Sequence, residues 1–186
     1  KWLQYMMSGM AKSFSAAILM ENRGQVKSFD LHKNKLSLIE KGAEKMGISV
    51  SSTSEKNGAE FDPSLEKTAD LVIVDAPCSG LGVIAKKPEI RYKKREDIAR
   101  LPEIQRAILE NSARYVKPGG RLFYSTCTLN IHENDEIADS FAKEHPEFER
   151  MAFGVGGINS RDGKITLRPD VHGTDGFFIS GFRRTK

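Results

Sequence analysis

Two cysteines carry the most reactive side chains of this sequence, and each follows an apolar run. The chain has 186 residues and two cysteines in all. Cys78 lies in VDAPCSGLG after the run LVIVD, and Cys127 lies in STCTLN after the run RLFY. Short apolar runs bounded by turn residues are typical of buried strands. Two predicted strands therefore end in loops that each present one thiol, a group that acts as a nucleophile once it ionises.

The loop after the first of these strands is built to hold a side chain rigidly above a sheet. Asp75 ends the apolar run, and Pro77 restricts the backbone directly before Cys78. We therefore expect a binding or catalytic site here, and two buried structural cysteines are the alternative. The small residues that would let a ligand approach this backbone are Ser79, Gly80 and Gly82.

Strand and helix patterns alternate along the chain. This alternation predicts an α/β fold with a doubly wound, mostly parallel sheet and crossover helices. The glycine-rich segment 154–164 is predicted to be a mobile loop. Helical patterns cover residues 11–22, 34–47, 95–116 and 132–145, and strand patterns cover residues 24–30, 48–52, 70–75, 121–126 and 175–184.

Ligands of such sheets bind beyond the carboxyl ends of the strands. This rule places Asp30, Asp75, Cys78 and Cys127 along one edge of the molecule. Asp30 ends the second predicted strand, where a carboxylate can accept hydrogen bonds from both ribose hydroxyls of a nucleoside cofactor. An ordinary loop aspartate is the alternative for Asp30.

Composition fits one soluble globular domain. Hydrophobic residues make up 39% and charged residues 29% of the chain. No apolar stretch approaches the roughly 20 residues that a membrane-spanning helix needs. The first ten residues do not read as a signal peptide. We expect a cytoplasmic monomer with no membrane partner, no metal and two free thiols.

Basic residues gather next to the first cysteine loop. The net charge is only +4, but residues 86–96 contain six Lys or Arg residues, and residues 181–186 contain three more. A basic run beside a candidate active-site loop favours a polyanionic substrate such as RNA. A solvated face is the alternative for either run taken alone.

Several motifs together resemble the Nol/Nop/Sun (Sun/Fmu) family of RNA 5-methylcytosine methyltransferases. They are DAPCSGLG, KPEIRYKK, VKPGGRLFYSTCTLN, ENDEI and GTDGFFISGF, in this order, and the resemblance runs from Lys12 to Arg184. It implies the Rossmann-like fold of class I S-adenosylmethionine-dependent methyltransferases, with an antiparallel C-terminal strand. It also implies S-adenosylmethionine as the methyl donor and rRNA or tRNA as the substrate.

The resemblance implies a role for each cysteine. In this family the cysteine of the TC motif adds to carbon 6 of cytosine, and the cysteine of the PC motif assists release. Carried over by motif, Cys127 is the nucleophile and Cys78 helps to resolve the adduct. DNA cytosine methyltransferases use the PC cysteine as the nucleophile instead, so the presence of both motifs favours RNA.

Further site residues follow from the same resemblance. Asp75 matches the aspartate that orients the base and meets the cofactor, and Pro77 follows it on the cofactor side. Lys12 matches a motif lysine near the target base, and an exposed lysine at a helix start is the alternative. Asn57 stands where the family often has an aspartate near the adenine, whose edge an amide can also bond.

One family motif departs from its pattern here. The family has DxCAAPGGKT at the cofactor loop, whereas this chain has MMSGMAKSF at residues 6–14. The strand and acid that precede the motif are expected to be absent. Either the cofactor loop is degraded, or the chain is an incomplete copy that joins pieces across a missing stretch. Residues 1–186 are expected to form a single methyltransferase catalytic domain that lacks part of its N-terminal region and any separate RNA-binding domain.

Two other functions stay open. One is a non-catalytic RNA-binding or ribosome-assembly factor on the same fold, favoured by the altered motif. The other is a thiol hydrolase that pairs Cys127 with His132 or His172. The missing nucleophile elbow counts against the hydrolase.

Overall fold

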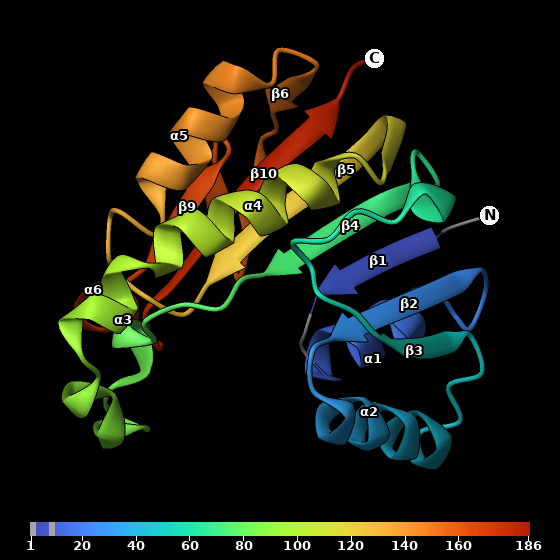
Figure 1. Ribbon diagram of the computed structural model, residues 1–186, viewed down its shortest axis with the longest axis horizontal. Helices are drawn as coiled ribbons and strands as arrows, with labels where there is room; N and C mark the ends of the chain where they lie inside the picture. The colour runs from blue at the N-terminus through green and yellow to red at the C-terminus, as the bar shows by residue number, and fades with distance from the viewer. Residues whose placement is uncertain (1–2, 8–9) are drawn as a thin grey trace.

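The fold is an α/β sandwich around one twisted sheet (Figure 1). The computed structural model describes the backbone of residues 3–7 and 10–186 and the side chains of residues 12–186. Within these residues the central sheet has eight strands, in the order β3-β2-β1-β4-β5-β10-β6, with β9 also paired to β10. The strands are β1 Leu3–Met7, β2 Gln25–Asp30, β3 Ser51–Glu55, β4 Ala69–Asp75, β5 Val116–Thr126, β6 Phe148–Arg150, β9 Lys164–Leu167 and β10 Phe177–Arg184.

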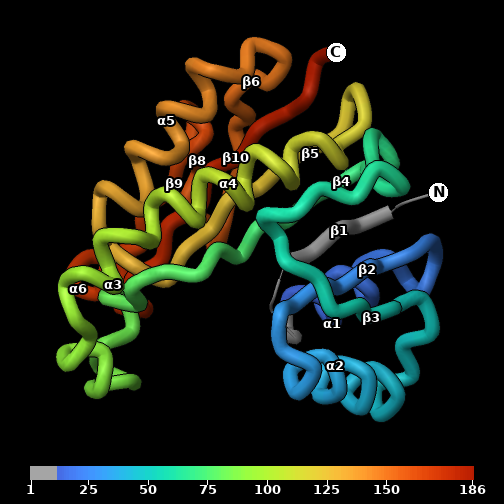
Figure 2. The backbone as a smooth tube through the Cα atoms, in the orientation of Figure 1, coloured from blue at the N-terminus to red at the C-terminus, as the bar shows by residue number. Residues whose placement is uncertain are grey.

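Strand directions confirm the predicted fold class. Strands β1 to β5 pair in parallel, and β10 pairs antiparallel with β5, β6 and β9. Parallel neighbours bring their carboxyl ends to one edge of the sheet. The loops that follow β4 and β5 consequently leave the sheet on the same side (Figure 2).

Helices cover both faces of the sheet (Figure 1). Helices α1 and α2 lie on one face, over β1 to β3, and α4 and α5 lie on the other. Alternate residues of β5 and β10, such as Leu122, Tyr124, Phe178 and Phe182, are fully buried in the main core. The helices are α1 Met10–Leu19, α2 Lys33–Lys45, α3 Arg95–Ala99, α4 Leu101–Ala113, α5 Asp135–Glu144 and α6 Pro169–His172, with 3-10 turns at Pro63–Leu65, Leu81–Val83 and Pro88–Tyr92.

The expectation that no strand precedes the altered motif is wrong. Residues Leu3–Met7 form β1, which lies between β2 and β4 in the middle of the sheet. A central parallel strand reads as a short apolar run without alternation, and this one is only five residues long. The run LQYMM contains no acidic residue. Residues 8–9 of the motif lie outside the described residues.

The predicted mobile loop at residues 154–164 is also wrong. Strands β7 (Phe153–Val155) and β8 (Ile158–Ser160) form a hairpin there, and β9 follows. Gly156 and Gly157 have φ values of 57° and 84°. Positive φ at both central residues is what a tight two-residue hairpin turn requires. The glycines thus mark a turn between strands.

Several predicted elements have different bounds. The helix expected over residues 95–116 is split into α3 and α4 at Arg100, because Pro102 begins a new helix more readily than it continues one. It ends at Ala113, and Val116 already belongs to β5. The strand expected at residues 48–52 begins three residues later, as β3.

No helix in the described part of the chain is long and apolar enough to cross a bilayer.

Candidate active site

The two cysteines meet at the carboxyl edge of the sheet. The Sγ atoms of Cys78 and Cys127 lie 3.3 Å apart, and both thiols are free. Their strands are neighbours, with Asp75 of β4 paired to Ser125 of β5. Each cysteine follows its strand within three residues, so the register alone brings the two loops together.

The contact makes the two thiols electrostatically unequal. A hydrogen bond from Cys78 lowers the pKa of Cys127 to about 7, although burial and the nearby Asp75 carboxylate oppose the shift. The same hydrogen bond, reinforced by burial, raises the pKa of Cys78. Cys127 is therefore the thiol that ionises first, with a substantial thiolate fraction near neutral pH, and Cys78 is the thiol that donates to it.

Beside the thiols, Asp75 and Lys12 form an ion pair. Lys12 Nζ lies 2.5 Å from Asp75 Oδ1, and both side chains are about one third exposed. Ser125 Oγ donates to the same carboxylate oxygen at 3.3 Å, and Lys12 Nζ lies 5.2 Å from the centre of the Phe177 ring. Four elements thus converge here: α1, β4, β5 and β10. Lys12 therefore does not simply extend into solvent at a helix start. It forms an ion pair with Asp75.

Glu133 joins the loops beneath the cysteines. Its side chain is fully buried, and Oε2 accepts hydrogen bonds from Ser79 N at 2.8 Å and Gln105 Nε2 at 2.9 Å. Oε1 accepts a bond from Asn130 Nδ2 at 2.9 Å. One carboxylate therefore ties the Cys78 loop, helix α4 and the Cys127 loop together. Sequence reasoning missed this role, although ENDEI contains the residue.

Asn134 forms a second clamp next to Glu133. Its Oδ1 accepts a bond from Thr126 Oγ1 at 2.5 Å, and its Nδ2 donates to Thr128 O at 2.9 Å. The Thr128 hydroxyl in turn bonds Ser79 Oγ at 2.7 Å. The Cys127 loop is thus held on both sides of the cysteine.

The small residues of the Cys78 loop pack against protein, contrary to the expectation that a ligand would approach them. Gly82 N donates to Cys127 O at 3.0 Å, and Gly176 N donates to Gly82 O at 2.8 Å. A Cβ at Gly82 would lie 2.1 Å from Gly176 O. Gly80, with a φ of 78°, packs against Ile90, and Ser79 is fully buried. These residues bring the loops after β4 and β5 against the segment before β10.

Asp30 lies where a cofactor ribose would be expected. It ends β2 and is 5% exposed, with Oδ1 accepting from His32 N at 2.9 Å and Oδ2 accepting from Lys35 Nζ at 3.3 Å. A carboxylate oxygen has two lone pairs, so each oxygen can accept one further bond. The acid therefore fits a pair of ribose hydroxyls.

Asn57 and Pro77 lie in the flanking loops. Lys56 N donates to Asp30 O at 3.1 Å, which brings the loop after β3 beside the end of β2. In that loop Asn57 bonds Glu60 Oε1 at 2.9 Å and accepts from Ala59 N at 3.1 Å. Pro77 is exposed, and its carbonyl accepts a bond from Gln105 Nε2 at 2.8 Å.

Part of the basic run 86–96 belongs to the site. Lys93 Nζ donates to Ser79 O at 2.9 Å, so this lysine fastens the Cys78 loop. Lys86 pairs with Asp175 at 2.6 Å. The remaining basic side chains of the run are exposed: Lys87, Arg91, Lys94 and Arg95.

The two histidines of the hydrolase alternative are occupied elsewhere. His132 Nδ1 bonds Glu136 at 2.8 Å, and His172 Nδ1 accepts from Arg168 N at 2.9 Å. Within the described residues, Cys127 Sγ has its hydrogen bond with Cys78. The geometry therefore offers a thiol pair where a hydrolase would need a cysteine–histidine pair. The same part of the chain contains no group of three or more His, Cys, Asp or Glu side chains that could hold a metal ion.

The fold and the position of the site define the class I methyltransferase fold. The crystal structure of PH0851 is similar to this chain with a TM-score of 0.89 and 32% identity, covering 98% of this chain and 42% of that one. The crystal structure of NSun6 from Pyrococcus horikoshii with SFG has a TM-score of 0.81 and 26% identity, covering 99% of this chain and 47% of that one.

Within that class, the chain belongs to the 16S rRNA methyltransferase RsmB/F family, which matches residues 7–183. The probable ribosomal RNA small subunit methyltransferase B of Bacillus subtilis (strain 168) is 43% identical over 182 residues, covering 93% of this chain. The alignment covers 40% of that relative, so the chain spans less than half of its length. The family confirms the resemblance read from the DAPCSGLG and STCTLN motifs.

Replacing Glu133 by Gln tests whether its buried carboxylate holds the two cysteine loops together. One of its oxygens becomes an NH₂ group that must face a donor, so we expect the free energy of unfolding to fall by about 1–3 kcal/mol. Urea denaturation measures the change. Glu66→Gln is the matched control, because Glu66 is exposed and its replacement should cost less than about 0.5 kcal/mol. Equal losses in the two variants would contradict the role of Glu133.

Proposed function

We propose that this chain is the catalytic domain of an RNA cytosine-5 methyltransferase that uses S-adenosylmethionine. The proposal rests above all on the thiol pair, with Sγ atoms 3.3 Å apart at the carboxyl ends of neighbouring strands. The names of its relatives support rRNA as the substrate class, with tRNA as the other candidate. Residues 1–186 would form this one domain.

The chemistry explains why a lowered thiol pKa is useful. Carbon 5 of cytosine is a poor nucleophile. When the Cys127 thiolate forms a bond to carbon 6, the ring becomes an enamine whose carbon 5 is nucleophilic. The bound cofactor supplies the methyl group that carbon 5 takes up. A base from solvent then takes the carbon 5 proton, the electron pair of that C–H bond re-forms the C5–C6 double bond, and the S–C6 bond breaks to return the Cys127 thiolate.

Cys78 would act both before the adduct forms and after it has formed. Before attack its thiol donates the hydrogen bond that holds Cys127 as a thiolate. Once Cys127 is bonded to the base, Cys78 is released from this bond and lies beside the reacting carbons, where it can assist elimination. Its raised pKa keeps it protonated and makes it the poorer nucleophile of the two.

Asp75 and Lys12 would orient the base. The exocyclic amino group of cytosine is a donor that aspartate accepts well. Lys12 Nζ lies 2.5 Å from Asp75 Oδ1 and would hold the carboxylate in position for this contact. The pair stands between the cysteines and the cofactor side of the sheet, so it can meet both substrates.

The cofactor would lie over the ends of β2 and β4. Asp30 has the acceptor capacity for the ribose, and the loop carrying Asn57 lies beside it. Pro77 would border the methionine side. These residues bind and orient the cofactor.

A non-catalytic assembly factor is the second candidate, because the motif at residues 6–14 departs from its pattern and β1 carries no acid. Calorimetric titration with S-adenosylmethionine separates the two functions. Only the enzyme requires the cofactor.

Asp30→Ala tests the cofactor site. We expect S-adenosylmethionine to bind more weakly by about 1–3 kcal/mol, because hydrogen bonds to a charged acceptor are lost. Calorimetric titration measures the affinity. Asp97→Ala is the control, since Asp97 is exposed on α3. Unchanged affinity in Asp30→Ala would remove this residue from the site.

Exchanging each cysteine for serine separates their roles. Cys127→Ser should abolish methylation and leave no covalent RNA adduct, because a hydroxyl is scarcely ionised near neutral pH. Cys78→Ser should still form the adduct but release it slowly. Denaturing gel electrophoresis after incubation with RNA and S-adenosylmethionine shows the adduct as a shifted band.

The gel distinguishes the alternatives as well. A band in Cys127→Ser and none in Cys78→Ser would assign attack to Cys78. No band in either variant would leave the covalent mechanism unsupported and favour the assembly factor.

A further inference from the structure

A basic hollow lies on the sheet away from the cysteines. It encloses about 470 Å³ and is lined by residues that include Arg121, Phe123, Met151, Phe153 and Arg183. These come from β5, from β10 and from the segment around β7. None of them belongs to the proposed active site.

Strand pairing places the two arginines of the hollow next to each other. Arg121 of β5 and Arg183 of β10 are directly paired residues of antiparallel strands, so their side chains leave the same face about 5 Å apart. Both are exposed, and neither forms an ion pair within the described residues. Glu149 of β6 also pairs with Arg183 in register, yet it makes no ion pair with it.

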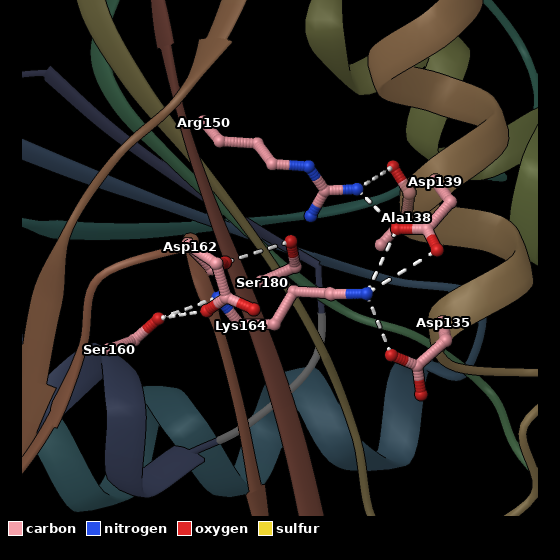
Figure 3. Close-up of polar contacts among 9 residues, drawn as sticks. Asp135, Ala138, Asp139, Arg150, Ser160, Asp162, Lys164 and Ser180 are labelled. Carbon is pink, nitrogen blue, oxygen red and sulfur yellow. Dashed lines mark hydrogen bonds and ion pairs between the residues drawn. The ribbon is translucent and has the colours of Figure 1, made fainter.

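Two nearby basic residues, Arg150 and Lys164, form ion pairs with acidic side chains, unlike the arginines of the hollow. Figure 3 shows Arg150 bonded to Asp139, and Lys164 bonded to both Asp135 and Asp139 of α5. These charges are neutralised inside the protein. Like charges opposite each other in a sheet are destabilising. The unpaired arginines therefore form a site that an anion would stabilise.

An apolar wall completes the hollow. The rings of Phe123 and Phe153 meet edge to face, with centroids 5.4 Å apart and an interplanar angle of 88°. Gly181 makes this possible, since a Cβ there would lie 2.9 Å from Phe123 and 3.0 Å from Phe153. The hollow thus joins two guanidinium groups to partly buried aromatic rings.

We propose that this hollow binds a nucleotide of single-stranded RNA that flanks the target cytosine. Planar guanidinium groups match phosphate oxygens, and aromatic rings stack on bases of any sequence. Phosphate and base together distinguish RNA from an acidic protein segment, which would use the arginines alone. The inference rests on the proposed function for the identity of the polymer.

The hollow and the active site share one face of β5. Arg121, Phe123 and Ser125 are alternate residues, so their side chains point the same way. Ser125 Oγ donates to Asp75 in the active site. Arg121 and Ser125 are four residues apart, about 13 Å along the strand. The hollow and the active site are thus close enough for one strand of RNA to reach both.

The test compares two double variants with the same loss of charge. Arg121→Gln/Arg183→Gln removes the proposed phosphate contacts, and Lys41→Gln/Lys45→Gln removes two exposed charges from α2. Fluorescence anisotropy with a short labelled single-stranded RNA gives the affinity at several salt concentrations. We expect the arginine variant to bind at least fivefold more weakly than the lysine variant. Its salt dependence should flatten by about 1.4 in slope, or 0.7 for each phosphate. Equal affinities and slopes would overturn the proposal.

A third variant addresses the base. Phe153→Leu should weaken binding of this RNA several-fold but leave binding of an abasic strand of equal length unchanged. An equal loss for both strands would overturn the contact with the base. Tighter binding of polyglutamate than of RNA at the arginines would overturn RNA as the occupant.

Methylation by the parent protein is measured separately. RNA binding at the hollow without methylation would contradict the proposed function but not the proposed RNA site in the hollow. Methylation by the parent protein, together with an RNA affinity that is unchanged in the arginine variant, would contradict only the proposed RNA site in the hollow.

Discussion

The parallel pairing of β4 with β5 is the constraint on which the rest of the site depends. Because Asp75 is level with Ser125, the loops that follow begin side by side, and their thiols meet at 3.3 Å. A slip of one residue would turn alternate side chains to the other face. Glu133 then fixes the loops through three hydrogen bonds to a fully buried carboxylate. The distance between the thiols is thus set by backbone pairing and by buried polar contacts.

This arrangement resolves a conflict of charge at the active site. A thiolate and the Asp75 carboxylate repel each other, and burial also disfavours ionisation of Cys127. The hydrogen bond from Cys78 outweighs both effects. Lys12 lies against Asp75 and offsets part of its negative charge. The Asp75 carboxylate can therefore lie near Cys127 without preventing the ionisation of its thiol.

Apolar runs and strand order predicted the α/β class and placed the two thiols at one edge of the sheet, whereas the antiparallel last strand was implied by the family resemblance. Sequence reasoning failed at β1, where five residues at the start of the chain show no periodicity of their own. It read Gly156 and Gly157 as mobility, although positive φ suits a hairpin turn. Glu133 was missed for a different reason. A buried carboxylate is recognised by its donors, which come from loops and a helix distant in sequence.

The hydrogen bond from Cys78 to the Cys127 thiolate is the central claim, and the pH dependence of alkylation tests it directly. Mass spectrometry would follow the reaction of Cys127 with iodoacetamide in the parent protein, in Cys78→Ser and in Cys78→Ala. A thiolate reacts and a thiol does not, so the rate should rise through a midpoint near pH 7 in the parent. Serine keeps a donor and should leave the midpoint close to that value, whereas alanine should move it up to the ordinary thiol value of about 8.5 or above, because burial and Asp75 still raise it. Identical midpoints in the three proteins, or faster alkylation of Cys78 than of Cys127 in the parent, would contradict the account.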